Sequence, residues 1–246
     1  MDMTIPGGRG LGCYCHHSIQ KQCKLILSGF TMRLSSRGIL EMDASASISY
    51  HAGTGAVNIF LHGCKSEQQK EIRDLLQANH YVLAGHPLLL PNTLVAMKLD
   101  LIERQENNLW EELVKVETLS KQTNRPAVGS SVSYDEPMMK NPLAGTNLSR
   151  NNISDSLQRF TIQVLGVLQE VTYIESHAKA LLLLIDKIQR SIDAVNKLAE
   201  SPQREYIANT GAMLSDSLDL LAHRTQVLLA DIQFIEKRAQ AQQSAV

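Results

Sequence analysis

The sequence is poor in aromatic residues and has no excess of either charge. Only 4% of its 246 residues are aromatic and Trp110 is the single tryptophan, which argues against the stacking platforms that bind single-stranded nucleic acids and against aromatic clefts for carbohydrates. The 24 lysines and arginines nearly balance the 25 acidic residues, so the chain has no broad positive field to hold a phosphate backbone. We therefore expect no nucleic-acid partner.

Long apolar runs are missing as well. The best one, "ALLLLI" at residues 180–185, stops at Asp186 and falls far short of the roughly 20 apolar residues that a membrane helix needs. We therefore expect no membrane span in this chain. The opening "MDMTIPGGRGLG" lacks the basic and then apolar pattern of a secretory signal, and this favours a soluble, cytoplasmic protein with four reduced cysteines.

A small sheet is predicted near the N-terminus. Apolar residues occupy every even position from Leu40 to Tyr50, and this period of two is typical of a strand with one buried face. Residues 24–34 form a plausible partner strand, and the alternation returns at Val57, Ile59 and Leu61. We assign a three-stranded β meander to residues 23–64 and a flexible arm to the glycine-rich residues 1–22.

The stretch "GHPLLLPNTL" at residues 85–94 predicts the start of a long helix. A helix tolerates proline only in its first turn, where the amides have no acceptor within the helix. A helix that starts near Leu88 places Pro91 in that turn. Residues three and four positions apart from Val95 to Val116 are then apolar, with Glu106 as the one exception, and they predict a helix over residues 88–121. We assign a short helix and this long helix to residues 65–123, and a mobile loop to residues 124–150, which are rich in proline, glycine and serine.

The strongest pattern is a pair of heptad series in residues 151–246. Apolar residues alternate at spacings of four and three from Ile153 to Ala199, and a second series runs from Ile207 to Ala239 after the "SPQRE" turn. Such spacing predicts two long helices that pack as an antiparallel hairpin. The packing seam of the first helix includes Leu157, Phe160, Val164, Leu181, Ile185, Ile188 and Ile192.

The predicted fold is therefore α+β and mostly α, with a small N-terminal β meander followed by long helices in an antiparallel coiled-coil-like bundle. The helix at 88–121 is much shorter than the one at 152–200, so it cannot cover the whole seam. We expect other copies of the chain or a helical protein partner to cover the rest.

The segments "FLHGCKSEQQKEIRDLL" and "HPLLLPNTLVAMKLDLIER", followed by two long heptad helices, resemble the cytosolic part of CorA-like proteins, the magnesium-transporter superfamily, in their divergent fungal type. The resemblance covers residues 57–240. Its local motif is a knuckle, made of His86, Pro87, Pro91, Glu103 and Arg104. The resemblance implies a divalent-cation transporter, but the two membrane helices and the Gly-Met-Asn pore signature of that family are absent from this chain.

Metal ligands of two kinds occur in the sequence. Soft ligands cluster at Cys13, Cys15, His16 and Cys23, but their spacing differs from that of a zinc knuckle and favours a tail with incidental thiols. The acidic residues of the long helices offer no convergent oxygen cage for Mg²⁺. We therefore expect no cofactor, with Mg²⁺ and Zn²⁺ as the alternatives.

Catalytic motifs are also absent, because no nucleophile or convergent set of titratable groups accompanies the scattered histidines. The sequence thus predicts a non-enzymatic helical protein that acts by self-association or partner binding. A truncated cation transporter, located at a membrane, is the first alternative, and an unrecognised enzyme is the second.

Overall fold

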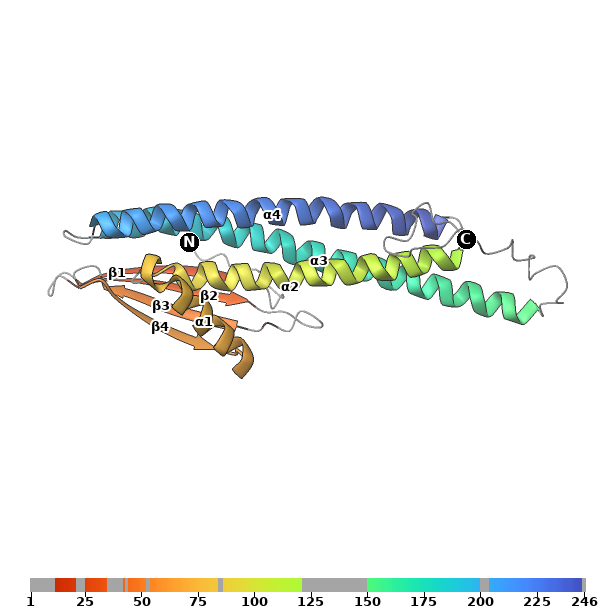
Figure 1. Ribbon diagram of the computed structural model, residues 1–246, viewed down its shortest axis with the longest axis horizontal. Coiled ribbons are helices and arrows are strands. Elements are labelled where there is room, and N and C mark those ends of the chain that lie inside the picture. Colours follow the sequence, from red (N-terminus) through yellow and green to blue (C-terminus); the bar gives the residue numbers. More distant parts are fainter. Residues whose placement is uncertain are drawn as a thin grey trace, which may run out of the picture. The chain divides into compact units, whose positions relative to one another are not determined.

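The computed structural model describes residues 12–20, 25–34, 42, 44–51, 54–83, 86–120, 150–199 and 204–244. These residues form a four-stranded antiparallel sheet and four helices (Figure 1). Two compact units divide them, the first made of residues 1–105 and 174–230, and the second of residues 106–173 and 231–246. The predicted α+β and mainly helical class is confirmed, while the loop predicted at 124–150 lies outside the described residues except for Arg150, which begins a helix.

The sheet belongs to the first unit and follows the chain order, with strands β1 (Gly12–Gln20), β2 (Leu25–Leu34), β3 (Ala44–His51) and β4 (Ala56–His62). In β3 the even residues are buried and the odd ones are half-buried or exposed, as the alternation predicts. The same face of β2 is buried at Phe30, Met32 and Leu34. Apolar side chains of two neighbouring strands therefore form one continuous core face.

Strand β1 corrects the prediction of a flexible arm at residues 1–22. It pairs antiparallel with β2 along its whole length, from Gly12 opposite Arg33 to Gln20 opposite Leu25. Strand pairing uses main-chain hydrogen bonds, which any residue except proline can make. A segment without apolar alternation can therefore join a sheet edge, and side-chain periodicity does not reveal it.

Helix α1 (Ser66–Leu83) precedes helix α2 (Leu89–Ser120), and the proline knuckle begins α2 as predicted. The N–H of Asn92 donates to the carbonyl of Leu88 at 3.1 Å, which is a four-residue bond of the helical kind. Pro91 stands one residue earlier and has no N–H to donate. It therefore lies in the free first turn.

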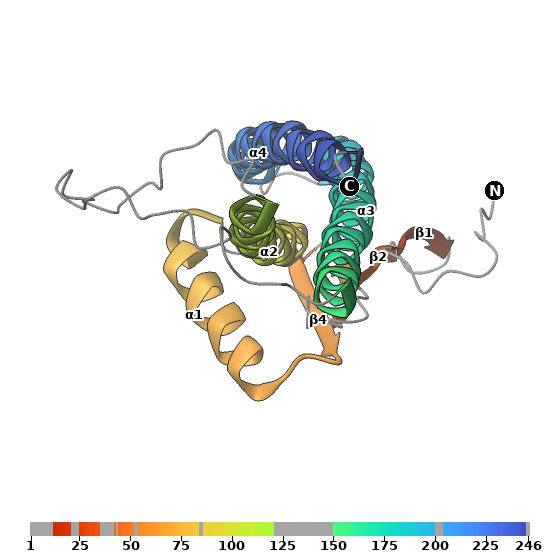
Figure 2. The ribbon, with the colours of Figure 1, turned by 90° about the vertical axis from the view of Figure 1, so that its right-hand side faces the viewer.

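Helices α3 (Arg150–Leu198) and α4 (Arg204–Ser244) form the predicted long pair, seen nearly end on with α2 in Figure 2. In α3 every predicted inward position from Phe160 to Ala199 is buried, and in α4 the same holds from Ile207 to Ala239. Both heptad series are thus confirmed over these stretches, while the side chain of Ile153 lies outside the described part. Leu157 is the exception, because 48% of it is exposed.

We expected α2 to be too short for the whole α3 seam to be covered within one chain. For Phe160–Ala199 this expectation is wrong. In the second unit, Val116 of α2 packs with Phe160 and Val164 of α3. In the first unit, α4 approaches α3 so closely that a Cβ on Gly211 would stand 2.9 Å from the side-chain oxygen of Asn196. Because the inward positions from Phe160 to Ala199 are buried within a single chain, no second copy is needed to cover this stretch of the seam.

Candidate functional site

One side of α4 is joined to α2 by polar contacts in the first unit. The Arg224 guanidinium donates to Glu103 at 2.6 and 3.1 Å and to Asp100 at 2.8 Å, and these hydrogen bonds raise the pKa of Arg224. The amide of Asn92 donates to the Ser217 hydroxyl at 3.1 Å. Since Ser217 and Arg224 are seven residues apart, they mark the line along α4 that faces α2.

The five residues of the predicted knuckle do not make one site. His86, Pro87 and Pro91 are buried together at the start of α2, whereas Glu103 lies more than three turns further on and pairs with α4. The Arg104 side chain is exposed. The knuckle therefore sets the start of a helix, and its charged end contributes to helix packing.

Burial lowers the pKa of two side chains in the first unit, His86 and Lys98. The Leu88 N–H donates to Nδ1 of His86 at 3.2 Å, and burial lowers the pKa of His86 to about 4. Burial also lowers the pKa of Lys98 to about 8. Neither His86 Nε2 nor Lys98 Nζ has a hydrogen-bond partner among the described residues, and both residues are almost fully buried. The folded state therefore favours the neutral form of both side chains.

We expect the protein to lose stability as the pH falls from about 6.5 to about 4, because the unfolded chain then binds a proton that buried His86 resists. At pH 5 this difference amounts to about 2 kcal/mol. His86→Asn keeps an acceptor for the Leu88 N–H and removes the titration. Urea unfolding at pH 7 and pH 5 should show the larger loss in the natural chain. Equal losses in the two proteins would show that His86 is not the group responsible.

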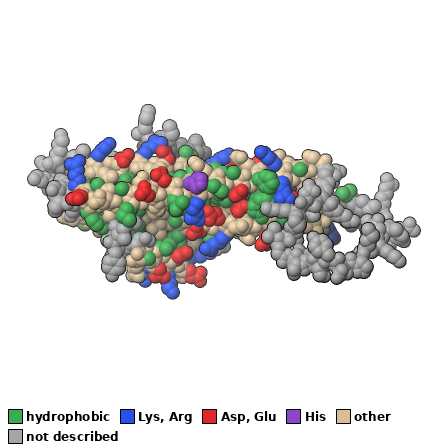
Figure 3. Space-filling model, turned by 45° about the horizontal axis from the view of Figure 1, so that its top comes forward, with side chains coloured by type: hydrophobic (Ala, Val, Ile, Leu, Met, Phe, Trp, Pro, Cys, Tyr) green, Lys and Arg blue, Asp and Glu red, His purple; other side chains and the backbone are tan. Residues whose placement is uncertain are grey.

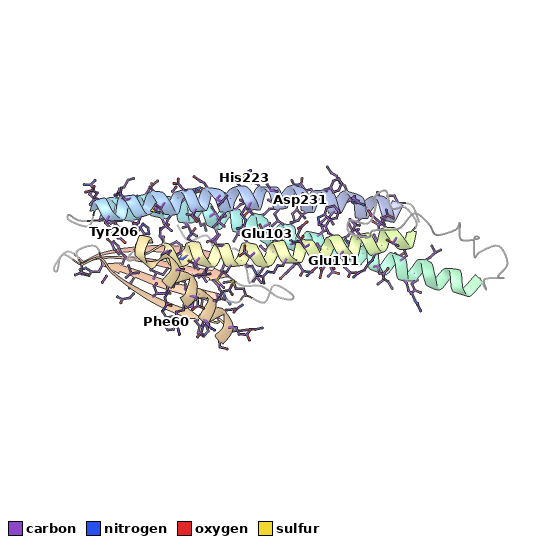
Figure 4. All side chains as sticks on the ribbon, in the orientation of Figure 1. Phe60, Glu103, Glu111, Tyr206, His223 and Asp231 are labelled. Carbon is purple, nitrogen blue, oxygen red and sulfur yellow. The ribbon has the colours of Figure 1, made fainter. Side chains whose placement is uncertain are left out.

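The most distinctive surface feature is a row of exposed apolar side chains on α4. In the first unit it consists of Tyr206, Met213, Leu220 and Val227, each 44 to 60% exposed and each seven residues from the next. We call these four residues the α4 stripe. Figure 4 labels Tyr206 at the start of this helix, and Figure 3 shows hydrophobic side chains that reach the surface between charged ones.

The α4 stripe runs parallel to the buried heptad series of the same helix. Each of its members directly precedes a buried inward residue, namely Ile207, Leu214, Leu221 and Leu228. The seven-residue spacing of the stripe is visible in the sequence, but we predicted only the inward series and missed the stripe. Exposure could not be read from spacing alone, since it depends on where α2 and α3 lie.

In the second unit the corresponding position of α4 is occupied differently. Phe234 is also exposed, but its ring lies 5.7 Å from that of Trp110, and the Arg238 guanidinium lies over both rings. Nε of Arg238 donates to the buried carboxylate of Glu117 at 2.8 Å. Because Phe234 already packs within the chain, we do not include it in the α4 stripe.

The candidate metal ligands receive no support from the described part of the chain. Cys13, Cys15 and His16 lie in β1, where only the backbone is described, and Cys23 lies outside the described residues. The described residues contain no group of three or more His, Cys, Asp or Glu side chains that could hold a metal ion. None of the described helices is long and apolar enough to cross a membrane.

No protein-family model matches the chain, and no curated protein matches it.

Proposed function

We propose that this protein is a non-enzymatic helical scaffold that binds an amphipathic helix of a partner protein along the α4 stripe. The observation that carries the proposal is the seven-residue spacing of four exposed, large apolar side chains. Two helices that supercoil around each other meet every seven residues along a straight seam. A partner helix with apolar residues at the same interval can therefore contact all four members of the stripe.

The expected affinity is modest. Complete burial of one such side chain contributes about 1.5–3 kcal/mol, and roughly half of each member remains to be buried. Four half-burials sum to about 3–6 kcal/mol, and the loss of translational and rotational freedom on association offsets much of this gain. The stripe therefore suits a transient contact, strengthened by polar groups at its margin.

The resemblance to CorA-like proteins remains a proposal beside this one. It is supported by the quoted segments and by the order of elements, in which a small sheet precedes long helices. A divalent-cation transporter is the alternative function, and it rests on that resemblance alone. The cytoplasm is the proposed compartment for the scaffold.

Site-specific photocross-linking in cells tests the scaffold function. A photoreactive phenylalanine analogue in place of Leu220 should form an adduct with a partner, and the cross-linked segment should be a helix with apolar residues every seven positions. The same analogue in place of Gln226, which is exposed on α4 but lies off the stripe, serves as the control. Equal adducts at both positions, or none at position 220, would contradict the proposal.

A further inference from the structure

Strand β4 leaves one edge of the sheet open. It pairs with β3 along Ala56–His62, and in the described sheet it has no neighbour on its other side (Figure 1). Natural sheets protect such edges with charged residues, prolines or bulges, because unpaired N–H and C=O groups invite another strand. The sequence of β4, "AVNIFLH", contains neither proline nor an acidic residue, lysine or arginine. This edge therefore lacks the usual protection.

The core face of the sheet is also partly exposed to solvent at β4. Ile59 lies opposite Ile48 of β3, yet 46% of Ile59 is exposed while Ile48 is buried. Its neighbours on the same face, Val57 and Leu61, are only half-buried. The apolar face thus continues across the last strand without being covered there. On the opposite face Phe60 is 67% exposed and is labelled in Figure 4.

We propose that β4 pairs antiparallel with β4 of a second copy of this chain, about a two-fold axis at Ile59. This register is self-complementary, as a two-fold interface requires. It sets Ile59 against its own counterpart, and it sets Val57 against Leu61 of the other copy, so that one apolar row meets another. No acidic residue, lysine or arginine is brought against a like charge. The pairing extends the sheet and uses the main-chain groups at the open edges of both copies.

The dimer is a different contact from the helix-binding stripe, and the two proposals fail separately. A dimer formed through β4 leaves the α4 stripes of both copies available, so that one assembly would present two helix-binding rows. Loss of dimerisation would leave partner binding on α4 untouched. Conversely, Leu220→Lys should abolish binding at the stripe and leave the dimer intact.

Light scattering on the purified full chain tests the proposal. The mass should rise from 27.3 kDa towards twice that value with increasing concentration. Ile59→Lys sets two positive charges against each other at the axis, so this variant should remain a monomer at every concentration. The control is Ser47→Lys, which adds the same charge at an exposed position of the inner strand β3 and should dimerise like the natural chain.

Disulfide trapping tests the register without a charge change. Directly opposed residues of antiparallel strands have Cα atoms about 4.5–5.5 Å apart, within the range that a disulfide spans. Ile59→Cys should therefore form a covalent dimer under mild oxidation, above the level given by the natural cysteines. Val57→Cys faces Leu61 rather than itself and should stay at that level.

Two results would overturn the proposal. One is a natural chain that remains monomeric at all concentrations. In that case an extended peptide from another protein would be the expected partner of the β4 edge. The other is dimerisation that survives Ile59→Lys together with equal cross-linking of Ile59→Cys and Val57→Cys, which would place the interface elsewhere.

Discussion

A Leu181→Ala variant is expected to unfold in urea at a clearly lower midpoint than the natural chain, with a loss of about 2–5 kcal/mol. Leu181 is fully buried in the middle of α3, so the truncation removes apolar contacts and leaves a cavity. Domains of ordinary size have a total unfolding free energy of only about 5–15 kcal/mol. The loss should therefore be visible in a single denaturation curve.

Lys179→Ala is the matched control. Lys179 lies two residues away on an exposed face of α3 and pairs with Glu175 at 2.8 Å. Exposed helical pairs of this kind contribute only about 0.3–0.5 kcal/mol, so the midpoint should hardly move. Equal midpoints for the two variants would contradict the assignment of Leu181 to the buried seam.

Leu99→Pro is expected to have the largest effect of these substitutions. Leu99 is buried two turns beyond the free amides of α2. Proline there removes a main-chain hydrogen bond and clashes with the preceding turn, at a cost of about 3 kcal/mol or more, and it also removes a buried leucine side chain. We expect loss of the folded state, measured by circular dichroism and by urea unfolding.

Pro91→Ala provides the comparison within the same helix. Because Pro91 occupies the free first turn, its removal restores an N–H that needs no acceptor within the helix. Pro91 is buried, so some packing is lost, but the effect should remain far below that of Leu99→Pro. If Pro91→Ala failed to fold, the proline would have a role other than starting the helix.

The local and periodic features of this protein could be predicted from its sequence. The spacing of apolar residues in α3 and α4 identified their buried faces from Phe160 to Ala199 and from Ile207 to Ala239, because a helix brings residues three and four apart to one side. The two prolines located the start of α2, because proline is excluded from a helix interior. Alternation identified β3. Each of these inferences depends on neighbours in the chain.

Contacts between distant segments were decided only by the tertiary structure. Glu103 meets Arg224, which is 121 residues further along, and no spacing rule predicts such a pair. We missed strand β1 in the sequence, because main-chain pairing does not require a particular pattern of side chains. The knuckle, read as a single motif, separates into a helix start and an ion pair.

The difference between the two heptad-spaced rows of α4 has the same origin. By itself the sequence determined that Leu221 and Leu220 both belong to apolar series with a seven-residue repeat. Only the packing decided that Leu221 is buried while Leu220 is 60% exposed. Apolar spacing specifies which residues share a face of a helix. Burial requires in addition that another element covers that face. For α4, the positions of α2 and α3 determine which face is covered.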